Sequence, residues 1–283
     1  MFDWIWPLKS VQGNVVVITG GATGLGRLVA LNFAALGAVV VIWDLHTESG
    51  RHVVSEIEAA GGTAQFYDVD VTDRERVLVI GRQVLNEWEA VDILVNNAGI
   101  VDGRSICEAS DDSIERTMAV NATSHFWTIK TFLPMMIQRD RGHIVAVASA
   151  AGIFGSPGMV DYGASKSAAI GLMFSLRQEL QAMDSFGVHT TIVCPGFITT
   201  GMFDGVTVPC FTQWLTPEFV AKKLVDAVRR NQFRVLLPPV LRVLELVATI
   251  MPMWFIDWFI RVTKTSQVMN TFRQTRAHVL KRE

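Results

Sequence analysis

The sequence is poor in cysteine and in clustered positive charge. Its 283 residues include three scattered cysteines, Cys107, Cys194 and Cys210. So small a number excludes a disulfide framework, and we interpret the cysteines as reduced thiols in a reducing compartment. The formal net charge is −2 and Lys and Arg never form a block of five, so we expect no nucleic-acid partner. The histidines lack metal-ligand spacing, and we predict no metal site.

Long apolar runs are absent as well. No stretch of 18 uncharged apolar residues is present, so a membrane-spanning helix is not predicted. Residues 1–10 contain Trp4 and Trp6 but lack the apolar run of a signal peptide, and we expect an intracellular protein. Half of the residues are nevertheless hydrophobic, including eight tryptophans, which is unusual for a soluble enzyme.

Apolar runs rich in β-branched residues alternate with stretches of helical periodicity. This alternation is typical of a parallel sheet covered by helices on both faces. We therefore predict an α/β protein with a doubly wound Rossmann fold and a seven-stranded parallel sheet. The predicted strands are 14–19, 38–43, 65–69, 91–95, 143–148, 189–194 and 233–237. The clearest predicted helices are 26–36, 47–60, 74–88 and 113–138.

A glycine-rich turn, Thr19-Gly-Gly-Ala-Thr-Gly-Leu-Gly26, follows the first predicted strand and opens a helix. Its glycines allow a tight turn and a close approach of the backbone to a pyrophosphate, and the helix N-terminus offers free N–H groups. Many such turns merely connect a strand to a helix. In this context we predict a dinucleotide site that includes Thr19, Gly20, Thr23, Gly24, Leu25 and Gly26.

Asp44 ends the second predicted strand, eighteen positions after Gly26. A carboxylate there can accept hydrogen bonds from an adenine ribose and would repel a 2′-phosphate, so the predicted cofactor is NAD rather than NADP. Alternatively, Asp44 caps the helix that begins near Thr47.

Polar and glycine residues also follow the later strands. Asp70, with Val71 beside it, is predicted to reach the adenine of the cofactor. Thr200 or nearby backbone is predicted to bind the nicotinamide carboxamide. An ordinary strand-ending turn would look similar in each place. The further predicted cofactor contacts are Asn97, Ala98, Gly99, Tyr162, Lys166, Pro195, Gly196 and Ile198.

Tyr162 and Lys166 are four positions apart in a predicted helix, which sets both on one face. An ammonium near a phenol lowers the phenol pKa, so the tyrosine can exchange a proton with an alcohol or carbonyl oxygen. Ser149 closes the fifth strand, where it can hold the substrate oxygen. Asn121 interrupts a helical stretch and is predicted to anchor a water that extends a proton path from Lys166. Alternatively, Asn121 makes only a local backbone bond or marks an exposed kink.

With these motifs together, residues 14–237 resemble the short-chain dehydrogenases/reductases. The resemblance rests on TGxxxGxG at 19–26, NNAG at 96–99 and YxxxK at 162–166. It implies hydride transfer between NAD and an alcohol or carbonyl, and a homodimer or homotetramer. The catalytic tetrad that it implies is Asn121, Ser149, Tyr162 and Lys166.

Segments 41–44, 125–128, 132–135, 142–145 and 200–203 resemble the retinol dehydrogenase branch. That branch is shared with relatives of 17β-hydroxysteroid dehydrogenase types 11 and 13, and 269–272 resembles a retinaldehyde-reducing member. The resemblance implies a retinoid, steroid or other lipid alcohol and attachment to endoplasmic reticulum or lipid-droplet membranes. The chain departs from the branch because only about a dozen residues precede the first predicted strand, where relatives carry a longer hydrophobic anchor.

We assign 1–238 to one nucleotide-binding and catalytic domain and 239–283 to a helical extension of it. Two short amphipathic helices around Pro252 are predicted to lie on a lipid surface. They could instead cap the substrate pocket or form a subunit interface, and in the case of a subunit interface the protein would be cytoplasmic. The Met-, Phe- and Trp-rich loop 201–214 is predicted to cover an apolar ligand or to pack in the core.

The predicted function is NAD-dependent interconversion of a hydrophobic primary or secondary alcohol and its carbonyl, with Tyr162 as acid and base. One alternative is a dehydrogenase of a small soluble hydroxy compound. Another is a catalytically silent NAD-binding protein at a lipid surface, which would not require Ser149, Tyr162 and Lys166 together.

Overall fold

The structure is a computed structural model that describes residues 8–206, 208, 213–263, 269 and 272. Seven strands form one parallel sheet. The strands are β1 (Val15–Thr19), β2 (Val39–Asp44), β3 (Thr63–Asp68), β4 (Ile93–Asn96), β5 (Gly142–Val147), β6 (Val188–Pro195) and β7 (Arg234–Leu237). Each matches a predicted strand to within two residues at either end.

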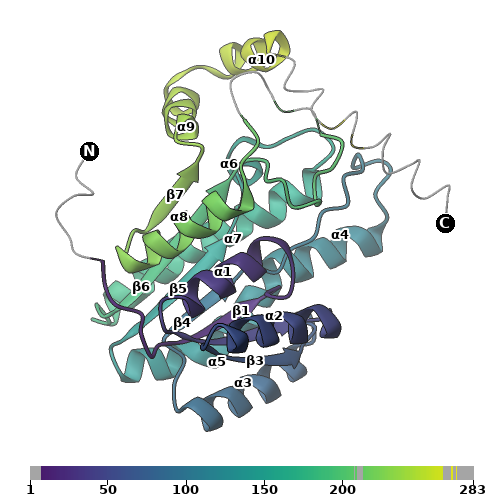
Figure 1. Cartoon of the computed structure of the whole chain (residues 1–283). Helices are drawn as coiled ribbons and strands as arrows, with labels where there is room; N and C mark the ends of the chain where they lie inside the picture. The colour runs from purple at the N-terminus through teal and green to yellow at the C-terminus, as the bar shows by residue number, and fades with distance from the viewer. Residues whose placement is uncertain (1–7, 207, 209–212, 264–268, 270–271, 273–283) are drawn as a thin grey trace.

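The strand order is β3-β2-β1-β4-β5-β6-β7, and every neighbouring pair is parallel. The chain therefore winds outward from β1 to β3 and then returns to wind outward from β4 to β7 (Figure 1). This reversal beside β1 opens a crevice at the carboxyl ends of the strands. The prediction of a doubly wound seven-stranded Rossmann fold is confirmed.

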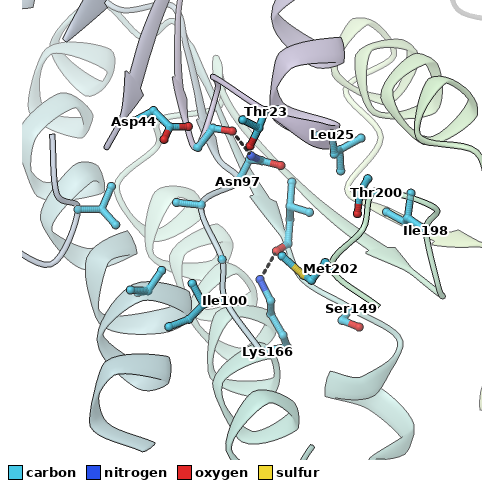
Figure 2. Close-up of a pocket in the computed structure, with 18 of the residues that line it drawn as sticks. Thr23, Leu25, Asp44, Asn97, Ile100, Ser149, Lys166, Ile198, Thr200 and Met202 are labelled. Carbon is cyan, nitrogen blue, oxygen red and sulfur yellow. Dashed lines mark hydrogen bonds between the residues drawn. The ribbon is translucent and has the colours of Figure 1, made fainter. Parts of the chain in front are cut away.

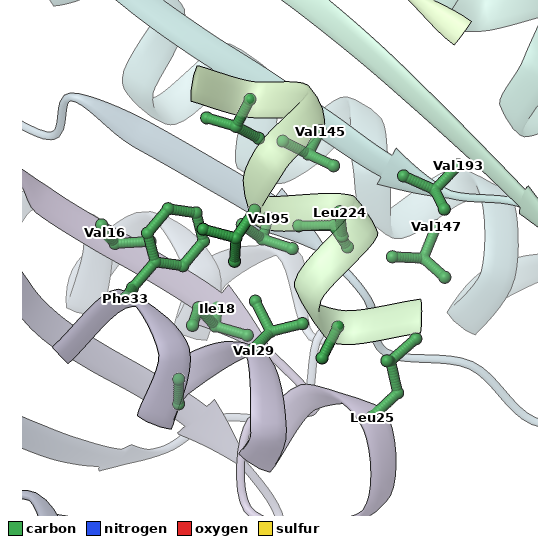
Figure 3. Packing of buried hydrophobic residues seen from close by; sticks show 14 of the residues in the cluster. Val16, Ile18, Leu25, Val29, Phe33, Val95, Val145, Val147, Val193 and Leu224 are labelled. Atoms are coloured by element: carbon green, nitrogen blue, oxygen red, sulfur yellow. The ribbon is translucent and has the colours of Figure 1, made fainter. Parts of the chain in front are cut away.

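Helices cover both faces of the sheet. They are α1 (Gly24–Ala34), α2 (Thr47–Ala59), α3 (Arg74–Trp88), α4 (Asp111–Met118), the π-helical η1 (Ala119–Thr123), α5 (Ser124–Gln138), α6 (Ala151–Phe154), α7 (Val160–Ala182), α8 (Pro217–Arg229), α9 (Val240–Ile250) and α10 (Met253–Val262). The core beneath α1, α2 and α8 includes Val16 of β1, whereas its neighbour Val15 belongs to the core beneath α3, α5 and α7. Figure 3 shows Phe33 of α1 and Leu224 of α8 over the first of these cores. Because both faces are buried, the strands read as continuous apolar runs.

One predicted helix is divided in the structure. The segment 113–138 was expected to form a single helix, but α4 and α5 are joined by the π-helical turn η1. Asn121 lies within this turn and is fully buried, so it does not mark an exposed kink. A π-helical turn widens the backbone locally, and such turns occur frequently at functional sites.

The helices α9 and α10 follow the last strand and extend beyond the end of β7 (Figure 1). Leu241 is the one buried residue of these two helices. Among the described residues, no helix combines the length and the apolar content that crossing a bilayer requires. Trp4, Trp6 and Cys210, which we singled out in the sequence, lie outside the described residues.

Candidate active site

A cavity of about 320 Å³ lies along the carboxyl edge of the sheet. Segments that follow β1, β2, β3, β4, β5 and β6 all contribute to its lining. Figure 2 shows Thr23, Asp44, Asn97 and Thr200 around this cavity, with Ser149 and Lys166 on its far side. We call it the nucleotide crevice, because its position and glycine-rich wall are those predicted for a dinucleotide.

Most predicted site residues meet in the nucleotide crevice. Its lining includes Gly20, Thr23, Gly24, Leu25, Gly26, Asp44, Asp70, Val71, Asn97, Ala98, Gly99, Ser149, Tyr162, Lys166, Pro195, Gly196, Ile198 and Thr200. Thr19 and Asn121 are not part of this lining and lie behind it, where they are buried.

The glycine-rich turn is packed against the segment after β4. A side chain at Gly20, which has a φ of +64°, would place its Cβ 2.9 Å from the Cα of Ala98. The Asn97 amide donates hydrogen bonds of 3.0 Å to the backbone oxygens of Thr19 and Gly20. In return, the Thr19 hydroxyl accepts from the backbone N–H groups of Asn97 at 3.0 Å and Ala98 at 3.1 Å. Thr19 therefore fixes the shape of the crevice from behind, and the cradle fits a diphosphate that must approach the backbone closely.

The carboxylate of Asp44 is held at the end of β2. Its Oδ2 accepts a hydrogen bond of 2.9 Å from the N–H of Ala22, and its Oδ1 accepts from the N–H of His46 at 3.0 Å. The alternative that Asp44 caps α2 is wrong, because His46 occupies the N-cap position. A carboxylate has about four acceptor sites, so one that lines the crevice can still accept from a ribose hydroxyl.

The carboxylate of Asp70 accepts hydrogen bonds within the turn that contains it. Its Oδ1 accepts hydrogen bonds from the N–H of Thr72 at 2.9 Å and from the Thr72 hydroxyl at 2.7 Å. This local pattern fixes the loop after β3. Asp70 and Val71 therefore line the crevice in an ordered turn.

Tyr162 and Lys166 lie on the buried face of α7, as their spacing predicts. The Lys166 ammonium donates a hydrogen bond of 2.9 Å to the carbonyl of Val147 in β5 (Figure 2), and it lies 5.7 Å from the centre of the Tyr162 ring. Ser149 follows β5, and its hydroxyl accepts from the N–H of Ala151 at 3.1 Å. A hydroxyl, a phenol and an ammonium are thus gathered at one end of the crevice.

The electrostatic prediction for this pair needs correction. We expected Lys166 to lower the pKa of Tyr162, but burial raises the pKa of Tyr162 to about 12, and a hydrogen bond with Ser149 opposes only part of this rise. Burial likewise lowers the pKa of Lys166 to about 8. Desolvation is the largest cause of both shifts, and it disfavours the charged form of each group. The phenol keeps its proton at neutral pH and is suited to donate it to a carbonyl oxygen.

Asn121 connects three parts of the site. Its Nδ2 donates to the carbonyl of Ile100 at 2.9 Å and to the Ser165 hydroxyl at 3.0 Å, and its Oδ1 accepts from the N–H of Ile100 at 2.8 Å. A Cβ on Gly99 would lie 3.2 Å from the Lys166 ammonium and 3.4 Å from the Asn121 Oδ1. The polar atoms of the Asn121 side chain are therefore committed to protein groups, and its predicted role as a water anchor stays a prediction.

A second cavity of about 370 Å³ adjoins the nucleotide crevice, and we call it the apolar pocket. Both cavities are lined by Ser149, Tyr162, Gly196 and Phe203. The other lining residues that the structure describes are Ala150, Ala151, Phe154, Gly155, Ser156, Met159, Phe197, Gln213, Pro238, Leu241, Leu244, Val247, Ala248, Phe255, Ile256, Phe259 and Ile260. No charged side chain is among these lining residues, so the apolar pocket is an uncharged chamber. The two cavities meet at the Ser149 hydroxyl and the Tyr162 phenol.

Sequence reasoning missed part of both linings. In the nucleotide crevice it missed Trp43, Leu45, His46, Val69, Ile100, Arg116, Val120, Val147, Ala148, Met202 and Phe203. Most are apolar, and an apolar residue after a strand resembles any core residue. For the apolar pocket the amphipathic pattern after Pro238 was a usable signal, and pocket capping was one of our alternatives for that segment. The described part of the chain contains no group of three His, Cys, Asp or Glu side chains arranged for a metal ion.

Comparison with known proteins agrees with this architecture. A family profile described as short chain dehydrogenase matches residues 14–208. The sequence is 43% identical over 250 residues to epidermal retinol dehydrogenase 2 of Mus musculus, which covers 87% of this chain and 81% of that protein. It is 38% identical over 273 residues to retinol dehydrogenase 10 of Homo sapiens, which covers 86% of this chain and 80% of that protein.

Solved structures give the same result. A short chain dehydrogenase/reductase from Burkholderia phymatum in complex with NAD has a TM-score of 0.78 at 26% identity, over 84% of this chain and 94% of that one. A metagenomic short-chain oxidoreductase in complex with NADP has a TM-score of 0.69 at 29% identity, over 81% of this chain and 97% of that one. The chain therefore belongs to the short-chain dehydrogenase family, resembles its retinol dehydrogenases, and is an oxidoreductase that acts on CH–OH groups.

Proposed function

We propose that this chain uses NAD to interconvert an apolar primary or secondary alcohol and its carbonyl, with Tyr162 as the acid and base. The observation that carries the proposal is the meeting of the nucleotide crevice and the apolar pocket at Ser149 and Tyr162. A reacting carbon placed there has a nucleotide site on one side and an uncharged chamber on the other.

In the direction of reduction, the substrate oxygen lies between the Ser149 hydroxyl and the Tyr162 phenol. Bound NADH supplies the hydride. Tyr162 donates its proton to the developing alkoxide, and the Lys166 ammonium stabilises the phenolate that remains. In oxidation, the same phenolate takes the proton of the alcohol. Asn121 has a supporting role: it lies outside the crevice lining and donates hydrogen bonds that fix Ile100 after β4 and Ser165 on α7.

The preference for NAD rests on Asp44. Its buried carboxylate lies at the crevice wall and is held there by two backbone N–H groups. Bringing a 2′-phosphate beside it would place like charges together in a partly desolvated site, which is unfavourable.

The substrate class follows from the apolar pocket. A chamber of about 370 Å³ without a charged lining residue favours an uncharged hydrocarbon skeleton over a phosphorylated or carboxylated substrate. Retinoids, steroids and other lipid alcohols meet this requirement, and the names of the similar retinol dehydrogenases point the same way.

The helices α9 and α10 support attachment to a lipid surface. Their inner residues line the apolar pocket, whereas Leu246, Ile250, Met253 and Trp254 on the outside are 61–71% exposed. Two short helices with a wide exposed apolar surface suit interfacial binding without crossing the bilayer. The proposal is therefore attachment to the endoplasmic reticulum or lipid-droplet membrane through 239–283, as an extension of the catalytic domain 1–238. The homodimer or homotetramer that the family resemblance implies is part of the same proposal.

The test is NAD reduction, followed by absorbance, with purified full-length protein and liposomes. The panel holds retinol, steroid alcohols and short-chain alcohols. Turnover of the lipid alcohols is expected. Turnover of only the short-chain alcohols would overturn the lipid assignment, and NAD binding without any turnover would support a silent binding protein instead.

A further inference from the structure

Helix α9 is joined to the sheet by a pair of opposite charges. Arg234 begins β7, the last strand of the sheet, and its guanidinium donates hydrogen bonds of 2.7 Å and 3.1 Å to the two carboxylate oxygens of Glu245 in α9. An arginine and a carboxylate bonded at two points fix each other's orientation as well as their separation. The two side chains are 24% and 30% exposed, so salt and water screen this pair less than a pair on the open surface.

Glu245 lies on a side of α9 that helps to form the apolar pocket. Leu241 is four positions before it and Ala248 is three positions after it, so the three side chains share one side of the helix. Leu241 and Ala248 both line the apolar pocket, as does Leu244, the residue next to Glu245. The bond to Arg234 therefore holds the helix at the level of its pocket-lining residues.

Packing holds α9 firmly only at its beginning. Leu241, in the first turn, is the one buried residue of α9, and α10 has none. Ile250 at the end of α9 and Met253 at the start of α10 are exposed. Segments with so little buried apolar surface open locally at a low cost in free energy. Beyond the first turn of α9, the position of the pocket wall therefore depends on the bond between Arg234 and Glu245.

Building on the proposed function, we propose that Arg234 and Glu245 are positioning residues that hold the α9 wall of the apolar pocket against long lipid alcohols. Neither residue lines the pocket or the nucleotide crevice, so the pair acts through Leu244 and Ala248. A long hydrocarbon skeleton that extends beyond Ser149 reaches this wall and gains binding energy from it. A short alcohol held at the reacting end makes no such contact, so the pair selects long substrates over short ones.

The experiment breaks the pair with Glu245→Gln in the full-length protein and measures turnover of retinol, in liposomes, and of a short-chain alcohol. We expect the KM for retinol to rise about tenfold, with its kcat and both constants for the short-chain alcohol unchanged, because only binding of the skeleton is weakened. Arg234→Met should have the same effect. The double variant should lose no more than either single variant, since one pair can be broken only once.

A matched control pair joins two helices on the other face of the sheet. Arg27 of α1 donates to both carboxylate oxygens of Glu56 in α2, at 2.8 Å and 2.6 Å, and these side chains are 34% and 37% exposed. Neither residue lines the apolar pocket, so Glu56→Gln should leave the KM for retinol unchanged. Equal rises in Glu56→Gln and Glu245→Gln would indicate a general loss of stability and would overturn the proposal. A wild-type KM in Glu245→Gln, or additive effects in the double variant, would overturn it as well.

Amide hydrogen exchange tests the positioning of α9 without any substrate. Exchange within 240–250 should be about tenfold faster in Glu245→Gln than in the wild type or in Glu56→Gln, because α9 opens more often. Unchanged exchange in this segment would refute the role of the pair whatever the enzyme turns over. Turnover of only the short-chain alcohol by the wild type would instead refute the lipid substrate of the proposed function.

Discussion

The Oδ2 atom of Asp44 accepts a hydrogen bond of 2.9 Å from the backbone N–H of Ala22. This bond joins the end of β2 to the glycine-rich turn, so the position of the negative charge is set by the same turn that forms the diphosphate cradle. Cofactor choice and cradle geometry are thereby linked through one side chain.

Asp44→Asn tests this link. The amide retains an oxygen that can accept from Ala22 but loses the negative charge. We expect the ratio of kcat/KM for NAD to that for NADP to fall at least about tenfold, which corresponds to about 1.4 kcal/mol. Asp70→Asn, a second carboxylate in the crevice, is the control and should keep the wild-type ratio. An unchanged ratio in Asp44→Asn would mean that another group selects the cofactor.

Tyr162→Phe should lower kcat by about a hundredfold or more, because the proton donor is lost. The phenyl ring can keep the edge contact with Phe203, whose ring centre lies 5.9 Å away, so folding and NAD affinity should be retained. NAD affinity is measured by fluorescence titration. Tyr67→Phe alters the one other tyrosine and should remain active. Substantial turnover in Tyr162→Phe would remove Tyr162 from the reaction.

Lys166 should make stability depend on alkaline pH. Its pKa is about 8 in the cofactor-free fold against the ordinary 10.5, so between these values the unfolded chain binds more protons and the free energy of unfolding rises with pH. The burial penalty is fully present below pH 8. We expect the unfolding free energy of the wild type to gain roughly 3 kcal/mol relative to Lys166→Met from pH 8 to 10.5. Denaturant titrations that give a constant difference would show that Lys166 is not buried in its charged form.

Gly26→Ala should destabilise the protein by about 2 kcal/mol or more, or prevent folding. The new Cβ would lie 2.0 Å from the backbone oxygen of Gly20 and 2.6 Å from the Asn97 amide. Gly171→Ala is the matched control on α7, where a Cβ meets nothing within 4 Å. That change should be neutral or stabilise by about 0.5–1 kcal/mol. Equal melting temperatures for the two variants would contradict the packing of the turn.

Replacing Trp254 and Trp258 together by Ser should weaken binding to liposomes by roughly tenfold. Their side chains are 71% and 53% exposed and do not line the apolar pocket, so turnover of a short soluble alcohol should be unaffected. Phe186→Ser is the control. Phe186 is 65% exposed, but it precedes β6 and therefore lies at the amino ends of the strands, away from the carboxyl ends that α9 and α10 adjoin. Co-sedimentation that is unchanged in the Trp variant, or equally weakened in the control, would argue against a lipid-binding surface on α10.

The sequence was most informative where backbone geometry restricts the residue type. Gly20 must accommodate a positive φ and the close approach of Ala98, and Tyr162 and Lys166 must share a helix face, so their spacing alone predicted their placement. Residues that act through packing carry no such restriction. Met159 and Phe154 line the apolar pocket, but nothing distinguishes them in the sequence from ordinary core residues.

One prediction about local structure and one about a pKa were wrong, and one predicted site residue lies outside the lining, each for an identifiable physical reason. A π-helical turn depends on what its side chains contact after folding, so the division at η1 could not be seen in the periodicity of 113–138. The pKa of Tyr162 depends on burial by several elements, whereas its spacing from Lys166 reports only their attraction. Thr19 lies behind the crevice because its hydroxyl is used by the segment after β4, a contact between residues far apart in the chain.

The wall that α9 and α10 give to the apolar pocket divides the active site into parts that tolerate mutation differently. The nucleotide side includes glycines in close contact with neighbouring backbone and hydrogen-bonded polar atoms, whose replacement strains the edge of the sheet. The proposed substrate side combines segments after β5 and β6 with apolar side chains on α9 and α10, and the apolar side chains of these two helices can be exchanged at similar volume with little cost in stability. Under the proposed function, substitutions in α9 and α10 can therefore change which alcohol is accepted, while the glycine-rich cradle and the Tyr162–Lys166 pair come from other segments and stay unchanged.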